Sequence, residues 1–151
     1  MKKVLIITGG RTDTDLVREV YEEYKPDVVI AADRGMMVAR EIDIVPDYVV
    51  GDFDSGEAEV VKYFKSLFET HGKPIVKAFN PEKDETDTEL AISLALTLSP
   101  KDIVLLGATG TRLDHTLANI ELLYKPLSGG VRTRIIDEHN VISIHDKDIT
   151  I

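Results

Sequence analysis

Short apolar runs alternate along the chain with segments in which apolar residues recur every three or four positions. The apolar runs cover residues 4–7, 28–32, 48–50, 74–78 and 103–106, and the runs at 28–32, 48–50 and 103–106 are followed directly by Asp or Gly. Parallel strands covered on both faces are apolar almost throughout. The segments between them, at 16–24, 36–40, 58–68, 86–98 and 113–123, have the period of helices with one buried stripe. The pattern predicts βαβ units that form an open, mostly parallel, Rossmann-like sheet with helices on both faces.

The pattern changes after residue 128. Successive side chains are expected on alternate sides of the chain in this segment. Arg132, Arg134 and Ile136 then fall on one side of a first strand, and Val141, Ser143 and His145 on one side of a second. This alternation predicts antiparallel hairpin strands at the C-terminal end. A further strand is expected at 149–151, where the sequence stops.

Composition narrows the function classes. The 151 residues include 18 Lys and Arg against 27 Asp and Glu, which gives a net charge of −9 and disfavours nucleic acid and anionic membranes. No cysteine is present, so disulfides and thiolate metal sites are excluded. The apolar run before Thr8 is too short for a signal peptide or a membrane span. We therefore expect one soluble globular domain in the cytoplasm.

Most of the distinctive acidic residues fall at or just after the carboxyl end of a predicted strand. In an open parallel sheet these ends share one edge, where ligands bind. Carboxylates crowded there would repel one another by about 1 kcal/mol or more per pair, so a cation must join them. Oxygen ligands without Cys or a His pair select a hard divalent ion such as Mg²⁺. The acids are Asp33, Asp52, Asp54, Asp84, Asp87 and Asp114.

The same edge is predicted to hold groups suited to phosphate. Arg34, Lys83 and Arg112 provide cations. Glycine-rich turns at 9–10, 35 and 107–110 let backbone amides approach an anion. Paired acids, a few bases and amide-lined turns together predict a site for a metal-bound nucleotide.

Each motif also has a structural alternative. In residues 51–55, Asp52 and Asp54 are spaced to share one ion, but Asp54 or Ser55 would also cap the next helix. In residues 83–87, Asp84 would serve as a cap, with Asp87 completing a capping box. For residues 107–115 the less favoured alternative is an ordinary surface loop. The isolated histidines at 71, 139 and 145 are expected to be solvated or to lie on strand faces.

Taken in order, these strings resemble the motifs of the thiamine pyrophosphokinase family. The family's catalytic domain has an Asp-Gly-Gly turn, a Gly-Asp-Phe-Asp-Ser motif, a Lys/Gln-Asp-x-Thr-Asp helix start and a Gly-x-x-Gly-x-Arg-x-Asp-His/Gln stretch that ends in Leu-Ala-Asn. The corresponding residues here are 33–35, 51–55, 83–87 and 107–119. Arg34 replaces the middle glycine of the first motif, and Thr111 replaces a glycine common after Gly110.

The resemblance implies transfer of the pyrophosphoryl group of ATP to thiamine, with Mg²⁺ and release of AMP, by a homodimer. It implies that Asp52, Asp54 and Asp87 hold the metal ion. It also implies catalytic roles for Asp33, Asp54, Arg112 and Asp114, with Asp33 or Asp54 taking the acceptor's proton. The residues expected to address ATP are Gly35, Lys83, Asp84, Thr86, Thr109, Gly110, Arg112 and Asn119.

The resemblance also sets expectations for domain organisation. Residues 1–128 would form the nucleotide-binding catalytic domain, and residues 129–151 the terminal strands where the family's C-terminal β-sandwich domain begins. On this reading that domain would be missing from these 151 residues, either because the sequence is truncated or because this family member is short. One alternative is therefore a protein that binds Mg-nucleotide without binding the acceptor. A less favoured alternative is an aspartate-dependent phosphatase, because residues 52–55 loosely resemble the Asp-x-Asp-x-Thr signature.

Overall fold

A single sheet organises the part of the chain that the computed structural model describes, which is residues 2–10, 12–51, 53, 58–78 and 86–150. Among these residues the sheet has seven strands in the order β4-β3-β2-β1-β5-β6-β7. All neighbouring strands are parallel except β6 and β7. The predicted open, mostly parallel sheet is confirmed. Its strands are β1 (Lys3–Ile7), β2 (Val28–Ala32), β3 (Tyr48–Gly51), β4 (Ile75–Ala78), β5 (Asp102–Leu106), β6 (Arg132–Ile136) and β7 (Val141–Ile142).

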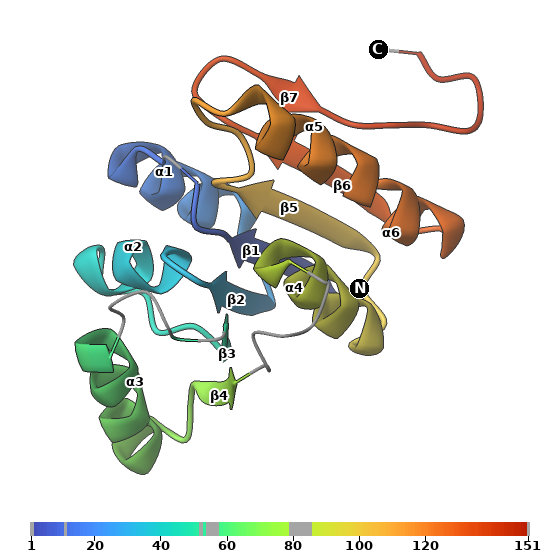
Figure 1. Cartoon of the computed structure of the whole chain (residues 1–151). Helices are drawn as coiled ribbons and strands as arrows, with labels where there is room; N and C mark the ends of the chain where they lie inside the picture. Colours follow the sequence, from blue (N-terminus) through green and yellow to red (C-terminus); the bar gives the residue numbers. More distant parts are fainter. Residues whose placement is uncertain (1, 11, 52, 54–57, 79–85, 151) are drawn as a thin grey trace.

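Helices cover both faces of the sheet, as the sequence predicts (Figure 1). On one face, α1 (Thr14–Tyr24), α2 (Gly35–Glu41) and α3 (Ala58–His71) bury Val17, Met36 and Phe64 against the strands. On the other face, α4 (Asp87–Thr97) buries Ala91, Ile92 and Ala95. This face also carries α5 (Leu113–Leu122) and α6 (Tyr124–Ser128). None of the described helices is long and apolar enough to cross a membrane.

The chain reverses direction across the sheet at β1. Strands β2, β3 and β4 are added in turn on one side of β1, and β5 then pairs with its other side, so the carboxyl ends of β1 and β5 form a topological switch point. Thr8, just past β1, donates its backbone N–H to the carbonyl of Leu106 at 2.8 Å. The Thr8 hydroxyl donates to the same oxygen at 3.0 Å. These bonds join the two turns that leave this edge.

The C-terminal segment differs in part from its prediction. β6 and β7 form an antiparallel pair as expected, but β6 also pairs in parallel with β5 along its whole length. Thr133 and Ile135 are buried, while Arg132 and Arg134 bond the carboxylate of Asp102. The alternation therefore reflects an ion-pair cluster on one side rather than a solvent-facing hairpin strand.

Beyond β7, the strand predicted at 149–151 is not formed at residues 149 and 150, and residue 151 lies outside the described residues. Residues 143–150 contain no strand and are mostly exposed. Charged residues at 146–148 interrupt the apolar alternation, so this stretch has no continuous face to bury against the sheet.

Candidate functional site

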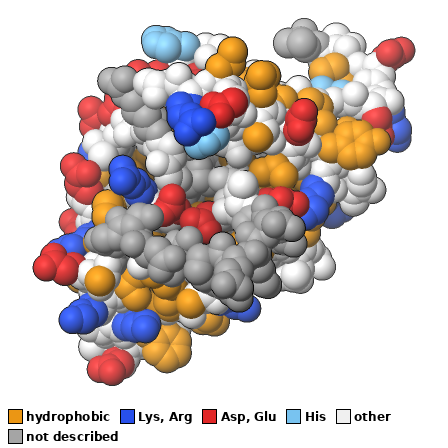
Figure 2. Space-filling view, viewed as in Figure 1, with side chains coloured by type: hydrophobic (Ala, Val, Ile, Leu, Met, Phe, Trp, Pro, Cys, Tyr) orange, Lys and Arg blue, Asp and Glu red, His pale blue; other side chains and the backbone are white. Residues whose placement is uncertain are grey.

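A cleft with a volume of about 560 Å³ lies at the switch point. Its walls are the turns after β1, β2 and β5, together with the first turns of α4 and α5. In Figure 2, acidic side chains lie near the centre of the surface, with basic side chains around them. The charged and histidine side chains that line the cleft are Asp33, Arg34, Asp87, Arg112 and His115.

Asp33 is held at the cleft by its backbone. It follows β2 in the left-handed conformation, with φ 54°, and its N–H donates to the carbonyl of Val50 at 3.0 Å. Its carboxylate lies against the β1 turn, since a Cβ placed on Gly9 would be 2.8 Å from Asp33 Oδ2. Arg34 has φ −68° and ψ −12°, a conformation open to any residue. The arginine that replaces the family glycine therefore strains no backbone.

The glycines of these turns are explained by close backbone packing. A Cβ on Gly10 would lie 1.9 Å from the Gly107 carbonyl oxygen, and one on Gly35 would lie 2.0 Å from the Ile7 oxygen. Only glycine allows such an approach between backbones. Gly35, which the family resemblance includes among the residues expected to contact ATP, is buried and lies outside the described lining of the cleft.

The first turn of α4 brings a second acid into the cleft. Thr86 is the N-cap residue, and its hydroxyl accepts the backbone N–H of Glu89 at 3.1 Å. The cap is therefore Thr86, which corrects the alternative in which Asp84 caps this helix. Asp87, the next residue, lines the cleft with Thr86 and Asp33.

Arg112 and Asp114 form a bidentate ion pair at the start of α5. The distances are 3.2 Å from Nε to Oδ1 and 2.7 Å from Nη2 to Oδ2. The hydrogen bond from Arg112 lowers the pKa of Asp114 below its usual value. Arg112 lines the cleft, whereas Asp114 is not among the described residues that line it. In this structure Asp114 holds the guanidinium group in place.

The β5–α5 loop, residues 107–112, is fixed by its own side chains. Asn119 Nδ2 donates to the Ala108 carbonyl at 2.8 Å. The Thr116 hydroxyl accepts the Gly110 N–H at 3.3 Å and donates to the Arg112 carbonyl at 3.2 Å. Asn119, Thr109 and Gly110 line the cleft, but the amide of Gly110 already has a partner.

The structure brings together seven of the predicted site residues. Of the other candidates, Gly35 and Asp114 are described but do not line the cleft. Asp52, Asp54, Lys83 and Asp84 lie outside the described residues. Gly51, the last described residue before Asp52, approaches Asp33: a Cβ there would lie 3.7 Å from the Asp33 nitrogen. The residues that line the cleft are Asp33, Thr86, Asp87, Thr109, Gly110, Arg112 and Asn119.

The described donors suit a hard cation but do not complete a site for one. Within the described ranges, no group of three or more His, Cys, Asp or Glu side chains is placed to hold a metal ion. Asp33 and Asp87 nevertheless present carboxylates to one cleft, and carboxylate oxygen is the donor that Mg²⁺ prefers.

Sequence reasoning missed a hydrogen-bonded turn next to the cleft. Asp137 follows β6 and accepts the Thr109 hydroxyl at 2.8 Å and the backbone N–H groups of His139 and Asn140 at 2.8 and 2.7 Å. Burial alone would raise the pKa of Asp137, but these hydrogen bonds together outweigh it and lower the pKa. Its position after a parallel strand was the available signal, hidden by the hairpin prediction for β6.

The fold and cleft define an open α/β protein with a ligand site at its switch point. Residues 21–135 match the family model described as thiamin pyrophosphokinase, catalytic domain. The chain belongs to this family.

Relatives agree with this assignment. The thiamine pyrophosphokinase of Bacillus subtilis is 35% identical over 147 residues, which cover 95% of this chain and 64% of that protein. The crystal structure of the thiamine pyrophosphokinase from Bacillus subtilis superimposes with a TM-score of 0.71 at 30% identity, covering 91% of this chain and 61% of that chain. A thiamin pyrophosphokinase family protein from Enterococcus faecalis gives a TM-score of 0.71 at 31% identity, with 94% and 64% covered. This chain therefore spans less than two thirds of the length of these relatives.

Proposed function

We propose that this chain binds Mg-ATP in the switch-point cleft and supports transfer of its pyrophosphoryl group to the hydroxyl of thiamine, giving thiamine diphosphate and AMP. The observation that carries the proposal is the convergence of Asp33, Asp87 and Arg112 on one cleft in a chain with this family's motifs. Opposed charges in one partly enclosed site are suited to a metal-bound polyphosphate. By resemblance and composition, the proposal includes a homodimer in the cytoplasm.

The proposed Mg²⁺ ligands are Asp87 together with Asp52 and Asp54, which lie outside the described residues. When bound, the ion neutralises charge on the phosphates. Asp33, next to the β1 turn, is a candidate to take the proton of the acceptor hydroxyl, and Asp54 is the other.

Arg112 is the proposed stabiliser of charge on the transferred group. Its pair with Asp114 uses two of the five N–H donors of the guanidinium group, which leaves three for phosphate oxygens. Asp114 thereby orients the cation in advance, which lowers the cost of ordering it when substrate binds. Asn119 and Thr116 give the loop a fixed shape, and we propose that Lys83, Asp84, Thr86 and Thr109 complete the ATP contacts.

A product assay tests the proposal. The chain is incubated with ATP, Mg²⁺ and thiamine, and nucleotides and thiamine esters are separated by chromatography. AMP and thiamine diphosphate are expected in equal amounts. Formation of ADP in their place would show transfer of a single phosphoryl group and would reject the proposed reaction.

A second candidate function is Mg-nucleotide binding without acceptor binding. It is favoured by the share of the relatives' length that this chain spans, 61% of the Bacillus subtilis structure. Calorimetry separates the two: this candidate predicts Mg²⁺-dependent binding of ATP and no saturable binding of thiamine.

A further inference from the structure

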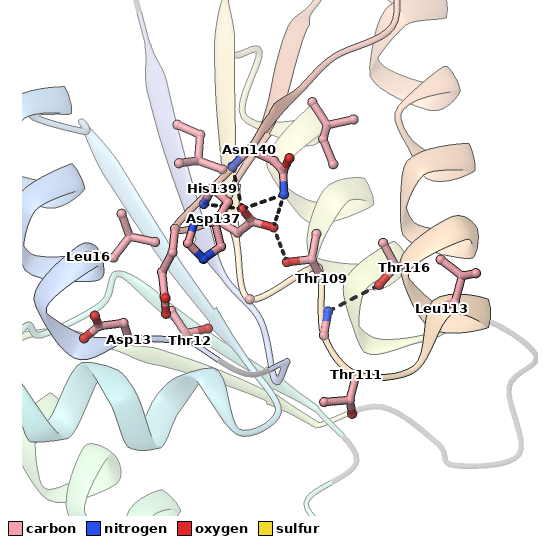
Figure 3. Close-up of a pocket in the computed structure, with 15 residues that line it drawn as sticks. Thr12, Asp13, Leu16, Thr109, Thr111, Leu113, Thr116, Asp137, His139 and Asn140 are labelled. Atoms are coloured by element: carbon pink, nitrogen blue, oxygen red, sulfur yellow. Dashed lines mark hydrogen bonds between the residues drawn. The ribbon is translucent and has the colours of Figure 1, made fainter.

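The β5–α5 loop is bonded to the turn between β6 and β7, which comprises residues 137–140. Asp137 Oδ2 accepts the Thr109 hydroxyl at 2.8 Å. Figure 3 shows this bond running from the turn to the loop. Thr109 lines the cleft, whereas Asp137 is not among the described residues that do so. Apart from its charge, Asp137 can therefore affect the cleft only through the loop.

Asp137 is itself held in a closed turn. Its Oδ1 accepts the backbone N–H groups of His139 and Asn140 at 2.8 and 2.7 Å. Its own N–H donates to the Asn140 carbonyl at 3.0 Å. The antiparallel pairing of Ile136 with Val141 joins the two strands at the base of the turn. The carboxylate therefore offers the loop an acceptor whose position is set by the sheet.

Glycines flank the middle of the loop, at positions 107 and 110, and glycine leaves a backbone conformationally free. Two side chains of α5 hold the loop from one side, through the carbonyl of Ala108 and the N–H of Gly110. Thr109 lies between these two residues and is held by Asp137 of the β6–β7 turn. Three successive loop residues are thus anchored by two different elements.

Charge and loop anchoring predict opposite effects of Asp137 on anion binding. Burial alone would raise the pKa of Asp137, but the hydrogen bonds of His139, Thr109 and Asn140 together lower it, so the group is a carboxylate at neutral pH. A negative charge near a cleft for polyphosphate repels the ligand, so on charge alone its removal would tighten binding. If Asp137 instead holds the loop in its binding shape, its removal weakens binding.

We propose that Asp137 is a positioning residue for the cleft, and that it fixes the β5–α5 loop through the Thr109 hydroxyl before the polyphosphate binds. A loop that is ordered in advance lowers the cost of ordering it on binding. The inference rests on the proposed function of the cleft. It adds to that function a residue of the β6–β7 turn, outside the described cleft lining.

Hydrogen–deuterium exchange without any ligand tests the anchoring step. Asp137→Ala removes the acceptor, and Thr109→Val removes the hydroxyl from the other end of the same bond. Each variant is expected to speed amide exchange in residues 107–112 about tenfold and to leave exchange in α4 unchanged. Unchanged exchange in the loop would overturn the positioning role, whether or not the chain binds ATP.

Calorimetry with ATP and with inorganic tripolyphosphate, each in the presence of Mg²⁺, tests the consequence for the cleft. Asp137→Ala is expected to weaken both ligands about tenfold, and to have little further effect in a chain that already carries Thr109→Val. Tighter binding would show that charge dominates and would overturn the proposal. So would weakening of ATP alone, which would place Asp137 against the nucleoside, or effects of the two substitutions that multiply. Failure of the native chain to bind either ligand would reject the proposed function of the cleft and the positioning role with it.

Asp47 provides the matched control. It is also a half-buried carboxylate that holds backbone, since its Oδ2 accepts the Val29 N–H at 2.8 Å, but it is not among the described residues that line the cleft. Asp47→Ala is expected to lower stability in urea and to leave the binding of both ligands unchanged. If Asp47→Ala weakens binding as much as Asp137→Ala does, the effect is general destabilisation and the assignment is overturned.

Discussion

Gly10 lies where the turn after β1 packs against the turn after β5. A Cβ there would lie 1.9 Å from the Gly107 carbonyl oxygen, and a backbone atom cannot rotate away as a side chain can. Gly10→Ala is expected to lower the free energy of unfolding by about 2 kcal/mol or more, as overpacking does, and to weaken ATP binding. Urea denaturation and calorimetry measure the two effects.

Gly129 offers the matched control for this substitution. It has φ −89°, and the nearest atom to a Cβ there would be the Pro126 oxygen, at 3.5 Å. Gly129→Ala should therefore leave stability and binding almost unchanged. Equal stability of the two variants would contradict the close approach of the β1 and β5 turns.

Asp87 is the described carboxylate for which we propose a metal-binding role. Asp87→Asn keeps the side-chain volume but weakens an oxygen ligand, so the rate of thiamine diphosphate formation should fall about 100-fold or more with little change in stability. Asp15→Asn is the control, because Asp15 also lies in the first turn of a helix but is not among the described residues that line the cleft. Near-normal turnover of Asp87→Asn would contradict the role in metal binding.

The sequence predicted the place of some residues in the candidate site but not of others. Asp33 and Asp87 were predicted to share one edge because each comes just after the end of a strand or at the start of a helix, and the cleft contains both. Asp137 has the same kind of position but was missed, because β6 was predicted in a hairpin. The pairing of Arg112 with Asp114 depends on side-chain rotamers, which sequence spacing does not specify.

Three elements meet at the amino-terminal edge of the sheet, opposite the cleft. Asp102 opens β5, and its carboxylate accepts the Tyr24 hydroxyl of α1 at 2.6 Å and Arg132 Nε of β6 at 2.5 Å. Burial alone would raise the pKa of Asp102, but the hydrogen bonds and charges of Arg132, Tyr24 and Arg134 together lower it. Burial and the bond to Asp102 raise the pKa of Tyr24. The cluster joins α1 to two strands.

Asp102→Asn is expected to lower the free energy of unfolding near neutral pH by about 1–3 kcal/mol, because it removes the charge of a buried acceptor that is hydrogen-bonded to Tyr24 and Arg132. A folded-state pKa below the ordinary value of 3.8 means that the carboxylate stabilises the fold fully above that pH and loses this effect as the pH falls below it. The difference in stability between the native chain and the variant should therefore narrow below about pH 4.

Urea denaturation at neutral and acidic pH measures this difference. Asp146→Asn, at an exposed position, serves as the control and should show little change at either pH. A stability difference for Asp102→Asn that stays constant down to about pH 3 would contradict the direction of the pKa shift.

The positions of the strands along the sequence were more predictable than the pairing between strands. The buried strands β1, β2, β3 and β5 follow from continuous apolar runs, which only a sheet covered on both faces accommodates. The pairing of β6 with β5 was not foreseen, because Arg132 and Arg134 interrupt its apolar pattern. Those arginines are explained by Asp102, thirty or more residues earlier in the sequence, and such long-range compensation leaves no local signal.

At the scale of the whole molecule, ligand binding should raise the free energy of unfolding. A ligand that binds only the folded chain raises the free energy of unfolding by about 2.7 kcal/mol at a concentration one hundred times its Kd. ATP with Mg²⁺ is therefore expected to raise the Tm by several degrees, and ATP with chelator to raise it much less. Differential scanning calorimetry provides the measurement, with sodium chloride of equal ionic strength as the control. An equal rise with and without Mg²⁺ would contradict metal-dependent binding.

The adjacency of β1 and β5 has a consequence for biosynthesis. The ribosome makes β1 first, yet the hydrogen bond from Thr8 to Leu106 spans 98 residues. One edge of β1 therefore stays without its β5 partner until residues 102–106 have been made, a state that favours chaperone binding. Nascent chains arrested before residue 106 are expected to retain no ATP on affinity resin, whereas released full-length chains should. The ability to bind nucleotide would thus arise late and abruptly during synthesis.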